Sequence, residues 1–219
     1  TIMAKKRQAL ALLEPILIDT FGLERLVPPQ PILSEWLDAS SIDSGVDFDA
    51  IELFLLKEIQ TKLSIGADFW NKEELKMKNI GLLLLLAKLE QPIDIYYSRE
   101  ISASINGIFM RCTPDMLLAK GIQGMIETAY FFAEFEDKRC NNDPVGKMLG
   151  AMLIAQANNN NGKPLYGCYV QGRFWFFSVL IGKQYVISNS FNASEITHLH
   201  QIIFILRKLK QIILERLMD

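Results

Sequence analysis

The hydrophobic pattern of the chain changes its period near Pro92. Before this point, apolar residues recur every three or four positions, which predicts helices over 47–63, with Asp47 as N-cap, and over 71–89. After it, apolar residues come in short alternating runs bounded by turn residues, which predicts strands. An order of helix, strands, helix, strands and helix indicates a mixed α/β sheet with helices packed on it.

The strands expected after Pro92 are short, and Asn106-Gly107 is a strong hairpin signal between the first two. Pro144 suits the first turn of a further helix. We expect strands over 93–101, 108–118, 129–138, 166–171, 174–180 and 184–188, and helices over 145–157 and 194–217.

A proline-rich break follows the first predicted helix. Residues 4–20 have apolar positions at helical spacing, and Pro28, Pro29 and Pro31 then impose an extended segment. We therefore predict a helical appendage and linker over 1–45, followed by a single α/β domain over 46–219.

The composition fits an ordinary globular protein. Half of the 219 residues are hydrophobic and the net charge is −2, which excludes a disordered chain. A pI near 5.8 argues against a nucleic-acid coat protein, although a local basic groove remains compatible with it. The apolar run 80–87 is too short to span a bilayer, no signal pattern opens the chain, and the three cysteines show no pairing pattern. We expect a soluble, cytoplasmic protein without membrane contact.

The strand predicted over 129–138 ends in charged residues. Alternation places Glu134, Glu136 and Lys138 on one face, where burial is costly unless the charges are paired, solvated or gathered around a cation. Asp115 lies on the preceding predicted strand. Carboxylates on adjacent strands supply the oxygen ligands that Mg²⁺ prefers, and a lysine beside them can orient or help to deprotonate an attacking water.

These residues resemble the motif of the PD-(D/E)XK nuclease superfamily, which has the restriction-endonuclease-like fold. Pro114-Asp115 corresponds to the PD, and Glu136-Asp137-Lys138 to the E-x-K. The resemblance covers roughly residues 71–217 and implies a core of helix, three strands, helix and strand. It implies that Asp115, Glu136 and the main-chain carbonyl of Asp137 bind Mg²⁺, with Mn²⁺ as substitute, while Lys138 assists the water. We expect cleavage of nucleic acid, DNA rather than RNA.

The resemblance also suggests residues on the flanking helices. Many members carry a glutamate on the helix before the first strand, for which Glu74 is our first choice and Glu73 or Glu52 are alternatives. Some carry a glutamine on the following helix, which Gln156 matches. Each has a purely structural interpretation, because carboxylates favour a first helical turn and polar residues favour a helix end. Candidates for phosphate contacts are Arg139, Lys147 and Arg173.

A structural interpretation also exists for the central residues. Asp115 follows a proline, as turn residues often do, and Glu134, Glu136 and Lys138 fit the solvated end of an edge strand. The alternative function is therefore a catalytically degenerate copy of the same fold, serving as a binding or assembly module. Its leucine-rich helices would then form a homodimer interface.

Overall fold

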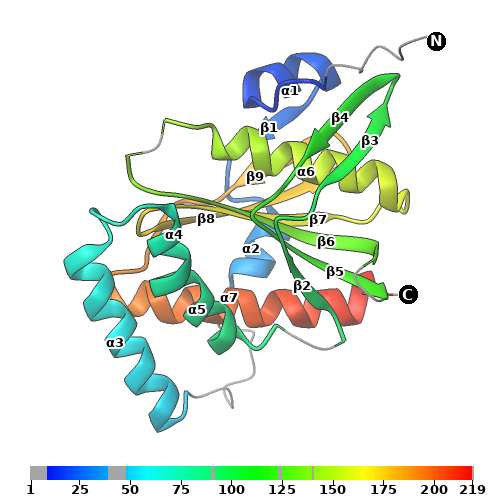
Figure 1. The fold of residues 1–219 in the computed structure, drawn as a ribbon. Coiled ribbons are helices and arrows are strands. Elements are labelled where there is room, and N and C mark those ends of the chain that lie inside the picture. The colour runs from blue at the N-terminus through cyan, green and yellow to red at the C-terminus, as the bar shows by residue number, and fades with distance from the viewer. Residues whose placement is uncertain (1–8, 39–47, 90–91, 123–124, 140, 219) are drawn as a thin grey trace.

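The computed structural model describes residues 9–38, 48–89, 92–122, 125–139 and 141–218. In this part of the chain a mixed, eight-stranded sheet lies between two layers of helices (Figure 1). The predicted α/β class with a mixed sheet is confirmed.

The sheet has the strand order β1-β9-β8-β7-β6-β5-β2, with β10 paired to β8. The pairs β6–β7 and β1–β9 are parallel, and the other pairs are antiparallel. A parallel pair needs a crossover connection, and α6 (Pro144–Asn159) provides it between β6 and β7. The strands are β1 (Glu24–Leu26), β2 (Asp94–Tyr97), β5 (Met116–Ile122), β6 (Met125–Glu136), β7 (Leu165–Gln171), β8 (Phe174–Ile181), β9 (Gln184–Ile187) and β10 (Phe191–Asn192).

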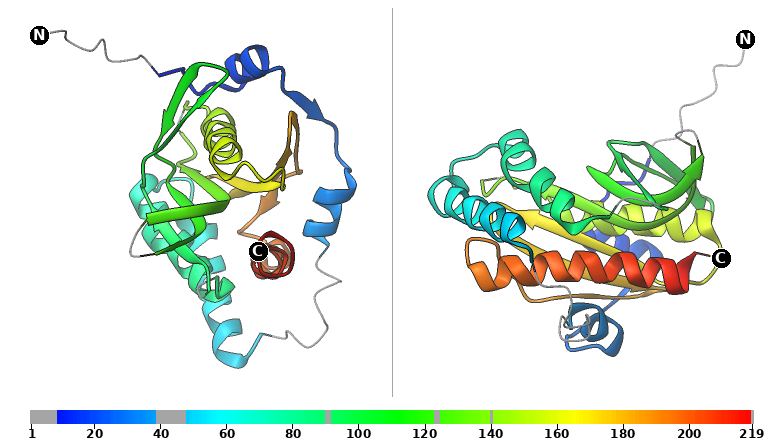
Figure 2. Two further views of the ribbon diagram at one scale, coloured as in Figure 1. Left: turned by 90° about the vertical axis from the view of Figure 1, so that its right-hand side faces the viewer. Right: turned by 90° about the horizontal axis from the view of Figure 1, so that it is seen from below.

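Helices cover both faces of the sheet, so that each face buries a hydrophobic core of its own (Figure 2). One face packs against α1 (Glu14–Phe21) and α6. The other packs against α2 (Pro31–Leu37), α3 (Ala50–Gly66), the continuous run of α4 (Lys72–Leu75), the π-helical turn η2 (Lys76–Ile80) and α5 (Gly81–Ala87), and the final α7 (Ile196–Ile212) with its π-helical turn η3 (Ile213–Leu217).

The strands before β5 differ from the prediction. Asn106-Gly107 does form a hairpin, with positive φ at both residues, but it joins β3 (Ile101–Ile105) and β4 (Ile108–Cys112), a separate two-stranded ribbon near α6. The predicted strands 93–101 and 108–118 are therefore each divided. A physical reason for the second break is Pro114, which has no N–H to donate to a ladder.

The strand that carries Glu134 and Glu136, β6, has different bounds from the predicted strand 129–138. It begins at Met125 and ends at Glu136, where the Glu136 carbonyl accepts a hydrogen bond from Gly172 N at 2.9 Å. Asp137 then turns the chain, because its Oδ1 accepts from Arg139 N at 2.9 Å. The prediction that Lys138 lies within this strand was wrong.

The helix before the sheet begins as predicted. The Asn71 side chain accepts from Glu74 N, and the Glu74 side chain accepts from Asn71 N, which completes a capping box. The preceding helix α3 is capped by Asp49, and the predicted cap Asp47 lies outside the described residues.

The described N-terminal residues pack into the fold. β1 pairs with β9, and Trp36 on α2 is fully buried, with its Nε1 donating to the Ile205 carbonyl at 3.0 Å. The predicted boundary at residue 45 lies outside the described residues and stays a prediction. None of the helices described is long and apolar enough to cross a membrane.

Gly146→Ala should destabilise the protein by about 3 kcal/mol, the upper part of the range for overpacking. A Cβ on Gly146 would lie 2.5 Å from the Leu12 carbonyl oxygen and 2.6 Å from Glu14 N. Both are backbone atoms, so they cannot move aside as the end of a flexible side chain can. Gly81→Ala is the matched control: its Cβ meets no atom closer than 3.6 Å, and we expect a gain of about 0.5–1 kcal/mol. Urea unfolding of both variants measures this, and equal stabilities would contradict the packing of the N-terminal segment on α6.

A candidate carboxylate–lysine site

Three carboxyl groups converge where β5 begins and β6 ends. Asp115 precedes β5, and Glu134 and Glu136 leave the same face of β6, two residues apart. The pairing of Met116 with Ala133 brings Asp115 next to Glu134. All three residues are buried, with exposed fractions of 9%, 4% and 3% for Asp115, Glu134 and Glu136.

Asp115 and Glu134 form a pair that holds one proton. Burial, the negative charge of Asp115 and a hydrogen bond between the two carboxyls raise the pKa of Glu134 from 4.5 to about 8. Burial also acts to raise the pKa of Asp115, but the Lys72 and Lys76 ammoniums and the Phe135 N–H outweigh it and lower that pKa. At neutral pH Asp115 is therefore ionised, and Glu134 is protonated.

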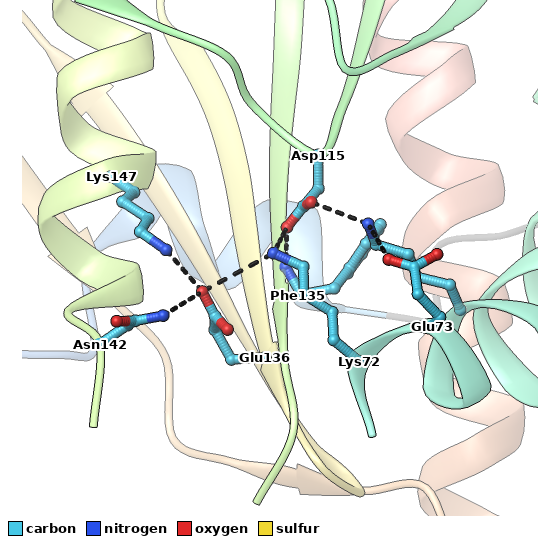
Figure 3. A network of polar contacts seen from close by, with 8 residues as sticks. Lys72, Glu73, Asp115, Phe135, Glu136, Asn142 and Lys147 are labelled. Atoms are coloured by element: carbon cyan, nitrogen blue, oxygen red, sulfur yellow. Dashed lines mark hydrogen bonds and ion pairs between the residues drawn. The ribbon is translucent and has the colours of Figure 1, made fainter. Parts of the chain in front are cut away.

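Ammonium groups from two helices contact Asp115 and Glu136 (Figure 3). From α4, Lys72 Nζ lies 2.7 Å from Asp115 Oδ2 and 3.7 Å from Glu136 Oε1. Lys76 Nζ lies 3.0 Å from Asp115 Oδ1. From α6, Lys147 Nζ lies 2.6 Å from Glu136 Oε1.

The loop before α6 and the strand backbone complete the network. Asn142 Nδ2 donates to Glu136 Oε1 at 3.3 Å, and Phe135 N donates to Asp115 Oδ2 at 2.9 Å. The site is therefore a group of buried oxygens that a proton, lysine ammoniums and neutral donors compensate.

Lys138 does not join this network. Its Nζ lies 3.0 Å from Asp68 Oδ2, and Arg173 lies 2.7 Å from the other oxygen of the same carboxylate. This ionic cluster connects the end of α3, the residues after β6 and the β7–β8 turn. The structure thus brings Asp115 and Glu136 together around Lys72, and it directs the Lys138 side chain to Asp68.

The other predicted site residues have partners elsewhere. Glu74 closes the capping box at Asn71 and pairs with Lys78 at 2.7 Å. Gln156 Nε2 donates to the Gly182 carbonyl, and Asp137 stabilises the turn after β6. Of the two alternatives to Glu74, Glu73 pairs with Lys76, and Glu52 pairs with Lys88 and Arg207.

Sequence reasoning missed Glu134 as a partner of Asp115, and Lys72 and Lys76 as their counterions. Glu134 has the same strand parity as Glu136, but the pairing register that sets it beside Asp115 is a tertiary property. Lys72 did leave a signal in the sequence. A lysine directly after a helix N-cap lies at the positive end of the helix dipole, where a cation is disfavoured.

The donor set suits a hard cation that keeps most of its waters. In the described residues, no group of three or more His, Cys, Asp or Glu side chains is arranged to hold a metal ion. Mg²⁺ is usually held by only one or two carboxylates, with water or phosphate oxygens completing its shell. Asp115 and Glu134 supply two, and a cation between them would replace their shared proton.

Comparisons of the sequence with protein-family models and with curated proteins gave no match.

Glu134→Gln should change how stability depends on pH. The folded-state pKa of Glu134 is about 8, and its usual value is 4.5. The contribution of Glu134 to the free energy of unfolding is therefore complete below pH 4.5 and is lost as pH rises to 8. Its share of the free energy of unfolding falls by about 1.4 kcal/mol per pH unit in that window. Glutamine mimics the protonated acid and removes this slope.

Urea unfolding between pH 5 and pH 8 measures this slope in the wild type and the variant. Glu127→Gln is the matched control, because Glu127 is exposed on the same strand and should leave the slope unchanged. Parallel stability curves for wild type and Glu134→Gln would contradict the protonated pair.

Proposed function

We propose that this protein is a metal-dependent phosphodiester hydrolase acting on nucleic acid. The observation that carries the proposal is the buried Asp115–Glu134 pair with Glu136 beside it, where Lys72 and Lys76 contact Asp115 and Lys147 contacts Glu136. Carboxylates suit a divalent cation, and ammoniums suit the phosphate that the cation would activate.

The order of elements supports this proposal. Leaving the β3–β4 ribbon aside, the chain runs through the α4–α5 helix, β2, β5, β6, α6 and β7. This is the sequence of helix, three strands, helix and strand that the resemblance to the PD-(D/E)XK superfamily implies. Asp115 directly precedes the second strand of this series, and Glu134 and Glu136 lie on the third, which is the order of the acidic residues in the motif.

Asp115 and Glu134 would hold the ion, with Glu136 beside them. When bound, such an ion lowers the pKa of a coordinated water and stabilises charge on a phosphate oxygen. Lys72, Lys76 and Lys147 lie near the carboxylates, and we assign to Lys72 and Lys147, which both approach Glu136, the assistance to the attacking water that the motif implied for Lys138. DNA is the first substrate to test, with RNA as the comparison.

A degenerate binding or assembly module is the second candidate. The observation that favours it is that ammoniums satisfy Asp115 and Glu136 without any metal ion. In such a module the ammoniums, with no metal ion, would compensate these carboxylates. The module would neither bind divalent cations nor cut nucleic acid, which distinguishes the two candidates.

Asp115→Asn and Glu134→Gln should each lower metal-dependent cleavage by at least about 100-fold, because each removes a charge that holds the ion. The assay is incubation of plasmid, single-stranded DNA and RNA with Mg²⁺, with Mn²⁺ and with EDTA. Glu127→Gln should cleave like the wild type. Wild-type protein that cleaves no substrate under any metal condition would favour the binding module, and equal cleavage by all variants would assign the activity to a contaminant.

A further inference from the structure

We infer that Lys72 is a built-in competitor of the metal ion: its ammonium occupies Asp115, beside Glu136, until a divalent ion that binds Asp115 and Glu134 displaces it. This inference rests on the proposed function and adds a regulatory element to the same site.

The contacts of Asp115 carry the first step. Lys72 approaches one of its oxygens and Lys76 the other, at 2.7 and 3.0 Å. A bound Mg²⁺ lies about 2.1 Å from a carboxylate oxygen, so it cannot share that oxygen with a close ammonium at full strength. Metal binding at Asp115 must therefore move at least one of the two lysines.

Lys72 is the lysine whose place the ion would take. It lies between Asp115, directly before β5, and Glu136, at the end of β6, and its shorter contact is with Asp115, a ligand that the ion would need. Lys76 contacts Glu73, an exposed carboxylate outside this cluster, at 3.3 Å and keeps that partner. Both ion-pair partners of Lys72 belong to the cluster, so an ion at Asp115 leaves Lys72 only its longer contact, the one with Glu136 at 3.7 Å.

The position of Lys72 on its helix makes the displacement feasible. It is the first residue of the helical run 72–87, where the helix dipole repels an ammonium. Asp115 and Glu136 compensate for this repulsion only while their carboxylates bind the Lys72 ammonium. Its side chain is 30% exposed, which gives the ammonium a route to solvent or to a phosphate bound over the site.

The consequence is a coupling between metal and substrate. A substrate phosphate gives the displaced Lys72 ammonium a new partner, so each ligand should strengthen the binding of the other by the same factor. Metal binding alone should be weak, because the ion must first displace an ammonium.

Mn²⁺ binding to the full chain tests this inference, with free Mn²⁺ counted by electron paramagnetic resonance at pH 8. Lys72→Met should bind Mn²⁺ at least about tenfold more tightly than the wild type, because the carboxylates lose their internal cation. The matched control is Lys78→Met, which removes the same charge from the same helical run at a lysine paired with Glu74. It should stay within about threefold of the wild type.

A second variant guards against loss of the fold. Lys72→Gln removes the charge but keeps a donor for Asp115, and it should also tighten Mn²⁺ binding. Thermal unfolding gives an independent measure: Mn²⁺ should raise the melting temperature of Lys72→Met more than that of the wild type. Both variants should cleave more slowly although they bind the ion more tightly, which separates this role from a general gain in metal loading.

The outcomes distinguish this inference from the proposed function. If Asp115→Asn abolishes Mn²⁺ binding but Lys72→Met and Lys72→Gln bind no more tightly than Lys78→Met, the inference is overturned and the metal site stands. If no variant binds Mn²⁺, both fail. Tighter binding confined to the two Lys72 variants supports both.

Discussion

The burial of three carboxyl groups at one end of the sheet is the constraint on which this structure depends. Removing a carboxylate from water costs several kcal/mol even after the protein relaxes, and Asp115, Glu134 and Glu136 lie within one small region. The chain compensates in two ways. Glu134 keeps its proton, as its raised pKa indicates, and lysines of α4 and α6 supply the positive charge.

This compensation fixes the positions of two helices. Lys72 opens α4 and Lys147 lies in the first turn of α6, so both helices direct their N-terminal ends toward the carboxylates. The partial positive charge of a helix N-terminus adds to that of the lysines. Asp143 caps α6 through its Oδ1 and accepts from Glu14 N through its Oδ2, at 2.7 Å, so the N-terminal α1 anchors the start of the same helix.

Local patterns predicted the local structure well. The capping box at Asn71 and the short strands on either side of Gly172 and Gly182 are encoded by residues close in sequence, and the structure has them as expected. The end of β6 was not predictable in this way. The chain turns at Asp137, and the Lys138 side chain then pairs with Asp68, 70 residues away in the sequence.

The candidate site divides in the same manner. Asp115 and Glu136 stood out because charged residues interrupt apolar strands, and the structure brings them near one ammonium. The place of Glu134 depends on a pairing register, and that of Lys72 on how α4 meets the sheet end. Residues close in sequence predict neither position. The unfavourable place of Lys72 at the N-terminus of its helix nevertheless indicates that Lys72 has a negatively charged partner.

The most direct test of this account is the number of protons released when Mn²⁺ binds. Calorimetric titration in buffers of different ionisation enthalpy gives this number without any substrate. If a cation replaces the proton shared by Asp115 and Glu134, about one proton should leave per ion at pH 7, and the number should fall toward zero above pH 9. Binding without proton release at pH 7, or no binding at all, would contradict a metal site at this pair.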